Sequence, residues 1–196
     1  FTFNLLKKYK EVRRICVIGD GKANFVIGAL KFFPNAQIFS INLPEVLIND
    51  YLILNKFRSL DDNKIQVVDQ IDTQIDEAKK LFLISPSLKD FCNRKKIDLF
   101  VNIASFQEMT MREINNYMNI IKSNKSLFYC CNREYKKLRG GEELIFDNYP
   151  WEKGKIILYE NCSWHQKYYT FRPPFIKKYD GKHKHCLIDY SQAEIE

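Results

Sequence analysis

Short apolar runs alternate with segments of helical periodicity over the first third of the chain, and this alternation leaves few folds open. Residues 15–19 are an apolar run that ends at a glycine, and residues 22–33 follow with apolar side chains at helical spacing. Residues 37–43 are a second apolar run, after which residues 44–57 return to helical spacing, with Pro44 at the first helical position. Strands that alternate with helices predict a parallel sheet with helices on both faces.

Three more strands are expected further along the chain. Apolar runs at residues 81–84, 97–103 and 126–131 have the length of buried strands, and a short helix is expected over 87–93. Apolar side chains at helical spacing over residues 111–121 predict a longer helix with one buried face.

The pattern changes after residue 150. Strand-like runs at 155–160, 168–172 and 186–190 follow one another with no long helix between them. Residues 60–79 are interpreted as an insertion, although residues 65–68 could also form a strand. A mostly parallel sheet that ends in an antiparallel hairpin is the layout of Rossmann-like class I methyltransferases, and ligands of such sheets bind beyond the carboxyl ends of the strands.

The length and the cysteines predict one domain in a reducing compartment. A chain of 196 residues fits a single domain over 1–196, and no apolar run reaches the ~18 residues that cross a bilayer. None of the six cysteines forms a CxxC pair, and Cys130 and Cys131 would point to opposite faces of a strand, which argues against a structural zinc site. We therefore expect reduced cysteines and a cytoplasmic location.

Basic side chains gather in two parts of the chain, within residues 7–14 and within 177–184, and the formal net charge is +7. Clusters of this kind are usually solvated faces of the fold. The alternative is a field that attracts an anionic substrate, a nucleic acid or an acidic membrane surface.

The turn Gly19-Asp20-Gly21 lies between the first strand and the first long helix. Glycines at such a turn let the backbone approach a ligand closely, and the helix amides point toward it. A dinucleotide fingerprint would need glycine at Asn24 and an acid at Asn42, and both are absent. The pattern typical of S-adenosylmethionine sites keeps Gly19 and Gly21 but loses its acid and its third glycine, so an ordinary tight turn is an equal alternative.

Asn42 ends the second strand, where a carboxylate normally accepts both ribose hydroxyls of a nucleoside cofactor. The amide oxygen of Asn42 could accept one of them, and Glu45 could assist. The alternative is that Asn42 caps the helix that begins at Pro44.

Four segments carry a resemblance to a known family: VIGDG at 17–21, INLPEVL at 41–47, DLFVNIASFQEM at 98–109 and DNYP at 147–150. The most specific part is NIASFQEM, which follows the fourth strand. On these residues the chain resembles the sugar O-methyltransferase family of bacterial surface-polysaccharide clusters. Members of that family usually have glycine at the position of Ala23 and aspartate at the position of Asn42.

The resemblance implies S-adenosylmethionine as the cofactor, a sugar or glycan precursor as the acceptor, and no metal. It places Gly19, Gly21 and Asn42 at the methionine and ribose of the cofactor, and Ser85 or Pro86 near the adenine. The full set of predicted cofactor-binding residues is Gly19, Asp20, Gly21, Asn42, Leu43, Ser85, Asn102 and Ser105.

Methyl transfer to a sugar hydroxyl needs a base that removes its proton. Glu108, after the fourth strand, and His165, after the strand at 155–160, are the two candidates. Glu108 could instead complement the dipole of the helix that follows. His183 and His185 would share one face of a strand, where an exposed or substrate-facing pair is expected rather than a metal site.

Two other functions stay open at this point. The positive charge favours a nucleic-acid methyltransferase, whose affinity would depend on salt. Ala23 and Asn42 favour a non-catalytic member of the methyltransferase fold that acts as an interaction subunit. Trp164, Tyr168 and Tyr169 offer flat surfaces for a sugar ring, although such aromatic residues are more often core.

Overall fold

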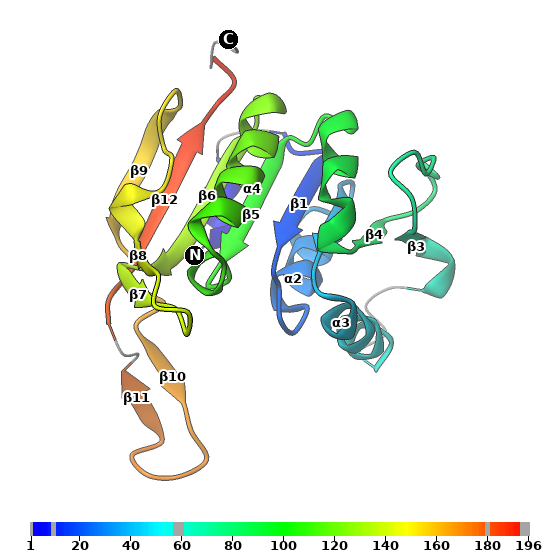
Figure 1. Cartoon of the computed structure of the whole chain (residues 1–196). Coiled ribbons are helices and arrows are strands. Elements are labelled where there is room, and N and C mark those ends of the chain that lie inside the picture. Colours follow the sequence, from blue (N-terminus) through cyan, green and yellow to red (C-terminus); the bar gives the residue numbers. More distant parts are fainter. Residues whose placement is uncertain (1, 9–10, 57–60, 179–180, 193–196) are drawn as a thin grey trace.

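An eight-stranded sheet organises the chain, with strand order β3-β4-β2-β1-β5-β6-β12-β9 (Figure 1). The structure is a computed structural model that describes residues 2–8, 11–56, 61–178 and 181–192. The sheet strands are β1 (Arg14–Ile18), β2 (Gln37–Ile41), β3 (Ile65–Val68), β4 (Leu81–Ile84), β5 (Leu99–Ile103), β6 (Leu127–Arg133), β9 (Lys155–Asn161) and β12 (His183–Asp189).

The first six strands of this order are parallel, and β12 pairs antiparallel with both β6 and β9. The predicted fold class, a Rossmann-like mostly parallel sheet that ends in antiparallel strands, is therefore confirmed. Residues 65–68 form the edge strand β3, so the interpretation of the whole of 60–79 as an insertion is wrong. The side chains of β3 are mostly part-exposed, which explains why its apolar pattern is weak.

Helices cover both faces of the sheet, and along the chain they alternate with the parallel strands. The helices are α1 (Thr2–Leu6), α2 (Asn24–Phe32), α3 (Pro44–Lys56) and α4 (Met111–Ser123), together with a 3₁₀ segment at Pro86–Arg94. In Figure 1, α4 and the 3₁₀ segment lie in front of the sheet and α2 lies behind it. Cys130 packs with the α4 side and Cys131 with the α2 side, so the opposite orientation predicted for this pair is confirmed.

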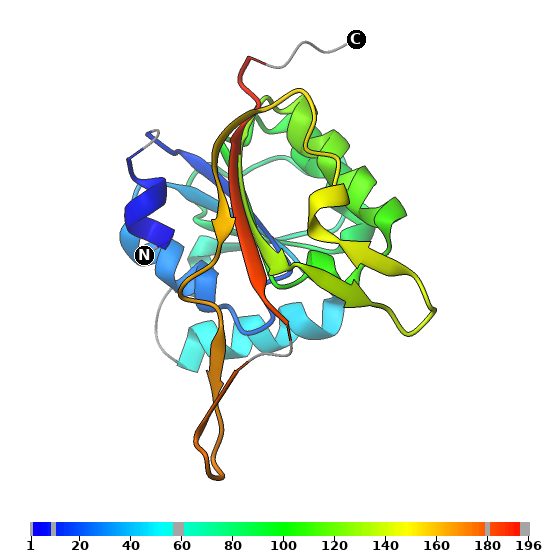
Figure 2. The ribbon, with the colours of Figure 1, turned by 90° about the vertical axis from the view of Figure 1, so that its left-hand side faces the viewer.

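Two small hairpins are added to this core. Strands β7 (Tyr135–Lys137) and β8 (Glu143–Ile145) form one, and β10 (Lys167–Tyr169) and β11 (Ile176–Lys178) form the other. The β10–β11 hairpin extends away from the body, beyond the carboxyl ends of the parallel strands (Figures 1 and 2). The strand expected over 168–172 is present as β10 but ends at Tyr169, because the chain then turns back toward β11.

Among the described residues, no helix is both long and apolar enough to cross a membrane. All six cysteines are free and buried.

Candidate functional site

Two cavities open at the carboxyl ends of β1, β2 and β5, where the fold predicts a ligand. The β2-side cavity has a volume of about 610 Å³ and includes Asn42, Leu43 and Pro86 in its lining. The hairpin-side cavity has about 590 Å³ and includes Phe3, Trp164 and His165. Both cavities touch the same four residues, so one thin wall separates them: Gly19, Gly21, Ile103 and Ala104.

Gly19 and Gly21 contribute to this wall in different ways. Gly19 has φ +74°, and a Cβ placed on it would lie 2.2 Å from the Ser105 hydroxyl. A side chain at Gly19 would therefore disturb the fold itself. A Cβ on Gly21 would meet nothing within 4 Å. Gly21 is thus the position where the backbone leaves room for a ligand.

The turn keeps its shape although the third glycine of the usual pattern is missing. Ala23 occupies that position, is fully buried and has φ +51°, a left-handed conformation that glycine adopts at less cost. The alanine therefore preserves the path of the turn at some strain. Asp20 does not face the wall with its carboxylate, which accepts the Val26 amide at 2.8 Å at the beginning of α2.

Asn42 is held by its amide nitrogen, which donates to the backbone oxygen of Asp20 at 3.0 Å and to Oδ2 of Asp50 at 3.1 Å. Because both bonds use Nδ2, Oδ1 is the group with which Asn42 could accept a ribose hydroxyl. Asp50 is 2 % exposed, and burial raises the pKa of its carboxyl to about 6. No acid ends β2, but the carboxylate of Asp50 on α3 binds the amide of Asn42, which occupies that position.

Asp50 is a site residue that the sequence analysis missed. It falls on the apolar stripe of α3, between Leu47 and Leu54 and beside Tyr51. The signal in the sequence was a single acid within an apolar helix face that packs toward the core, since a buried charge usually has a specific role.

The NIASFQEM segment ties three strands together at the cavity end. The Asn102 amide donates to Ile18 O at 3.1 Å and to Ser105 Oγ at 2.5 Å, while its oxygen accepts from Asn132 at 2.8 Å. Ser105 Oγ also donates to Ile18 O at 2.9 Å. Asn102 is fully buried, so it does not reach a ligand itself but holds Ile18 and Ser105 in position through its hydrogen bonds. Ser105 lines the β2-side cavity.

Of the two remaining predicted cofactor residues, Leu43 lines the β2-side cavity and Ser85 does not. Leu43 is 58 % exposed. Pro86 lines the cavity too, while the Ser85 hydroxyl lies 2.6 Å from that of Ser87. Of the two residues proposed near an adenine, Pro86 is thus the one in the cavity wall.

The two candidate bases lie in different cavities. Glu108 lines the β2-side cavity and pairs with Lys136 at 3.2 Å. It lies in the turn Phe106–Glu108, two residues before the N-cap Thr110 of α4, so the alternative that it complements the dipole from inside the first turn is wrong. His165 lines the hairpin-side cavity.

His165 stacks on His183, with ring centroids 4.5 Å apart. Burial lowers the pKa of His165, and burial together with the neighbouring His165 lowers the pKa of His183 to about 4. Both imidazoles are therefore neutral at pH 7. The ring centroids of Trp164 and His165 lie 5.1 Å apart, and Trp164 is 39 % exposed.

The expectation of an exposed or substrate-facing pair at His183 and His185 is wrong, because both side chains are fully buried. His185 Nδ1 lies 3.1 Å from the Tyr129 hydroxyl and its Nε2 3.2 Å from Glu160. Within the described ranges, no group of three metal-ligating side chains is present.

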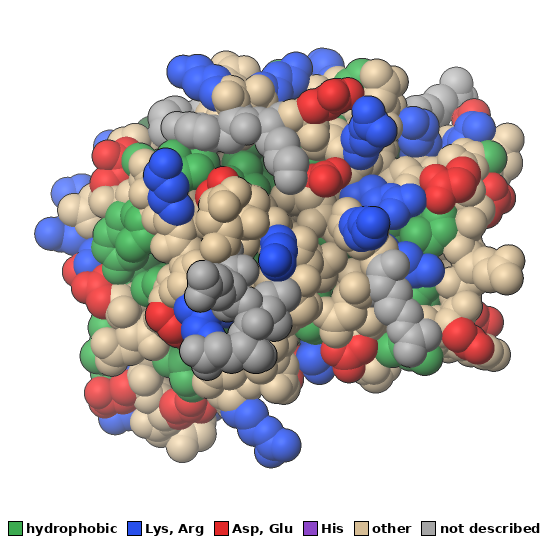
Figure 3. Space-filling model, turned by 90° about the horizontal axis from the view of Figure 1, so that it is seen from above, with side chains coloured by type: hydrophobic (Ala, Val, Ile, Leu, Met, Phe, Trp, Pro, Cys, Tyr) green, Lys and Arg blue, Asp and Glu red, His purple; other side chains and the backbone are tan. Residues whose placement is uncertain are grey.

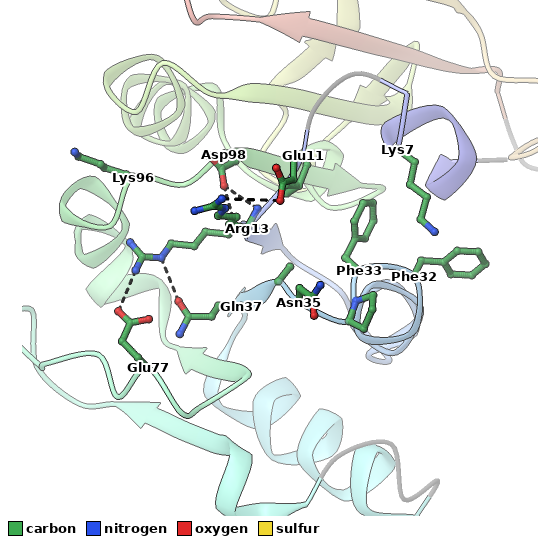
Figure 4. A pocket seen from close by; sticks show the side chains of 14 residues that line it. Lys7, Glu11, Arg13, Phe32, Phe33, Asn35, Gln37, Glu77, Lys96 and Asp98 are labelled. Atoms are coloured by element: carbon green, nitrogen blue, oxygen red, sulfur yellow. Dashed lines mark hydrogen bonds and ion pairs between the residues drawn. The ribbon is translucent and has the colours of Figure 1, made fainter.

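A larger pocket, of about 710 Å³, lies at the opposite end of the sheet (Figure 4). Asp98 accepts the backbone amides of Arg13 and Arg14, both at 2.9 Å. The Arg14 guanidinium binds Gln37 and Glu77, both at 3.1 Å. Several polar groups of this pocket therefore bind one another, and the two strands that contribute to its lining, β1 and β2, begin there.

Comparison with known proteins finds structural relatives only. No family model matches the sequence, and no curated protein matches it. Solved structures do match, among them TrmK from M. capricolum in complex with S-adenosyl-homocysteine, with a TM-score of 0.57, 13% identity and coverage of 100% of this chain and 71% of that chain.

Two further structures extend the comparison to other methyltransferases. The methyltransferase domain of bacterial CtHen1 matches with a TM-score of 0.52 and 11% identity, over 96% of this chain and 95% of that one. The mitomycin 7-O-methyltransferase MmcR matches with a TM-score of 0.53 and 11% identity, over 91% of this chain and 49% of that one. The chain therefore has the Rossmann-like fold found in S-adenosylmethionine-dependent methyltransferases.

Proposed function

We propose that this protein is an S-adenosylmethionine-dependent O-methyltransferase that acts on a sugar hydroxyl of a bacterial surface glycan or its precursor, in the cytoplasm. The observation that carries the proposal is the meeting of two cavities at Gly21, whose missing side chain leaves open space. A methyltransferase needs two adjacent compartments of this kind, one for the methyl donor and one for the acceptor.

The β2-side cavity fits the cofactor. Asn42 Oδ1 would accept a ribose hydroxyl, and the apolar side chains of the exposed Leu43 and the part-buried Pro86 would flank an adenine. The open space at Gly21 would receive the methionine part. When bound, the cofactor would supply a methyl group on a sulfonium, and an oxygen nucleophile that attacks the methyl carbon in line would displace the neutral thioether S-adenosyl-homocysteine.

The hairpin-side cavity fits the acceptor. Trp164 and Phe3 give it flat apolar walls on which a sugar ring can pack. Among the described residues that line it, Asp20 is the one acidic residue, and its carboxylate is bound to α2.

His165 is the base that we propose for this cavity. Its neutral imidazole can take the hydroxyl proton as the oxygen attacks the methyl group. The stacked His183 keeps the imidazole in place. Glu108 lies on the cofactor side, and its ion pair with Lys136 would instead fix the turn at Phe106–Glu108 to β7.

The direct test is titration of the protein with S-adenosylmethionine. We expect wild type to release heat and to gain thermal stability with ligand concentration. Gly21→Val places a branched side chain in the shared wall and should weaken binding at least about 100-fold. A Cβ at Gly140 also meets open space, in the turn between β7 and β8, so Gly140→Val is the matched control and should bind like wild type.

The titration also separates the competing functions. Binding by Gly21→Val with unchanged affinity would mean that the cofactor lies elsewhere. No binding by wild type at millimolar ligand would favour a non-catalytic interaction subunit. Mass spectrometry of surface glycans with and without the protein then tests the acceptor, because loss of one methyl group per repeat identifies a sugar product.

A further inference from the structure

The tip of the β10–β11 hairpin carries apolar side chains that no described residue covers. Phe171 is fully exposed and Tyr169 is 85 % exposed. Phe175 is 58 % exposed and Ile176 is 50 % exposed. Pro173 and Pro174 between them are exposed as well. Removing such side chains from water is favourable, so a projecting apolar tip of this kind is expected to bind a partner or a membrane.

Basic side chains lie around and behind the tip. Residues 167–178 contain four basic residues and no acidic one. Lys167 pairs directly across the hairpin with Lys178, and Tyr169 with Ile176. Like charges opposite one another destabilise a two-stranded ribbon, which is marginal in water by itself. An anionic surface would offset that repulsion.

The opposite end of the molecule lacks this bias. Seen from above in Figure 3, that end shows Lys and Arg side chains interspersed with Asp and Glu. The single-sign charge of the hairpin is therefore a local feature and not only a reflection of the basic composition.

The root of the hairpin is fixed to the site. Gln166 Nε2 donates to the backbone oxygens of Cys162 and His183, which joins the root to β12. His165, in the wall of the hairpin-side cavity, lies only two residues before β10. The hairpin also extends from the end of the sheet at which that cavity opens (Figures 1 and 2).

We propose that the β10–β11 hairpin docks this protein on an anionic phospholipid surface. The apolar tip enters the boundary between headgroups and acyl chains, and the lysines behind it contact the lipid phosphates. A single-stranded RNA is the other polyanion to consider, but bases stack on aromatic rings distributed along a basic groove. Here the apolar side chains, which include Ile176 and two prolines, gather at one tip instead.

Docking would hold the hairpin-side cavity close to the membrane. This part of the inference rests on the proposed function, and it makes a lipid-linked glycan precursor the acceptor rather than a free sugar. The docking itself does not depend on methyl transfer, so its test uses no cofactor.

The experiment is sedimentation of the whole chain with vesicles. We expect binding to vesicles of equal parts phosphatidylglycerol and phosphatidylcholine, and at least about tenfold weaker binding to phosphatidylcholine alone. Phe171→Ser with Phe175→Ser should weaken binding to the anionic vesicles at least about tenfold. The matched control is Ile48→Ser with Leu52→Ser, which removes two exposed apolar side chains from α3 and should leave binding unchanged.

Other outcomes overturn the proposal. If the tip variant binds vesicles like wild type, or if wild type does not bind them, the hairpin is not a lipid anchor. If the same variant loses affinity for a single-stranded RNA probe in fluorescence anisotropy while wild type ignores vesicles, the hairpin is an RNA arm. If wild type is a dimer in sedimentation velocity and the tip variant a monomer, the occupant is a second copy.

A second measurement tests the orientation. Trp151→Phe leaves Trp164, in the cavity wall, as the only tryptophan of the chain. We expect energy transfer from Trp164 to dansyl-labelled lipid when anionic vesicles are added. Binding without energy transfer would show that the cavity faces away from the membrane.

Discussion

The two ends of the central sheet differ in how their polar groups are satisfied. At the amino end, Asp98 accepts two backbone amides and Arg14 binds Gln37 and Glu77, so several polar groups of the 710 Å³ pocket already bind one another. At the carboxyl end, Gly21 leaves open space between two cavities. The difference shows that the volume of a pocket is a weaker guide to function than the chemistry of its lining.

The largest effect should come from the imidazole at the carboxyl end. His165→Gln removes the proposed base and should slow methyl transfer by roughly 10²-fold or more, with little change in cofactor affinity. Because burial lowers the pKa of His165 below its ordinary 6.5, the rate of wild type should be constant around pH 7. It should fall only when the pH drops below that lowered pKa and the imidazole is protonated.

Glu108→Gln is the matched comparison, since it also replaces a cavity-lining group with an amide. Its rate should stay close to that of wild type. A drop of roughly 10²-fold for Glu108→Gln with an unchanged rate for His165→Gln would reverse the assignment of the base.

A smaller effect, on stability, is expected at Asp50 below the cofactor cavity. Its pKa in the folded protein is raised from 3.8 to about 6, so the folded protein binds more protons than the unfolded chain between these values. The free energy of unfolding therefore falls as the pH rises through this window, by roughly 3 kcal/mol at most. Asp50→Asn should abolish this fall and be more stable than wild type at pH 7.

Urea denaturation at pH 4 and pH 7 measures the effect. Asp72→Asn, on an exposed side chain, is the control and should keep the pH dependence of wild type. The same slope with pH in Asp50→Asn would show that another group is responsible.

The smallest effect is expected at the amino end. Glu77 is 70% exposed and pairs with Arg14 at 3.1 Å, so Glu77→Gln should change the free energy of unfolding by no more than about 0.5 kcal/mol. Its affinity for S-adenosylmethionine should equal that of wild type. A large loss of affinity would mean that the pocket at the amino end is the binding site and would break the comparison.

Much of the fold could be predicted from the sequence. Buried parallel strands give continuous apolar runs, and β1, β2, β4 and β5 were visible as such. The edge strand β3 was not, because few of its side chains are buried. The β10–β11 hairpin was not either, because its apolar side chains face solvent and therefore follow no burial pattern.

The site divides in the same way. The sequence pointed to the glycine turn, to Asn42 and to His165, because chemistry-bearing residues at strand ends are recognisable in a parallel fold. It could not show that Glu108 and His165 line different cavities, nor that Asn102 is buried and holds Ile18 and Ser105 in position.

The amino-acid sequence by itself determined the alternation of strands and helices and hence the end of the sheet at which ligands bind, because hydrophobic periodicity is a local property of the chain. Only the tertiary structure decided the different roles of Gly19 and Gly21, since one faces Ser105 and the other open space. It also decided the partnership of Asn42 with Asp50. These roles depend on which distant segments come into contact, and that is fixed by packing rather than by spacing along the chain.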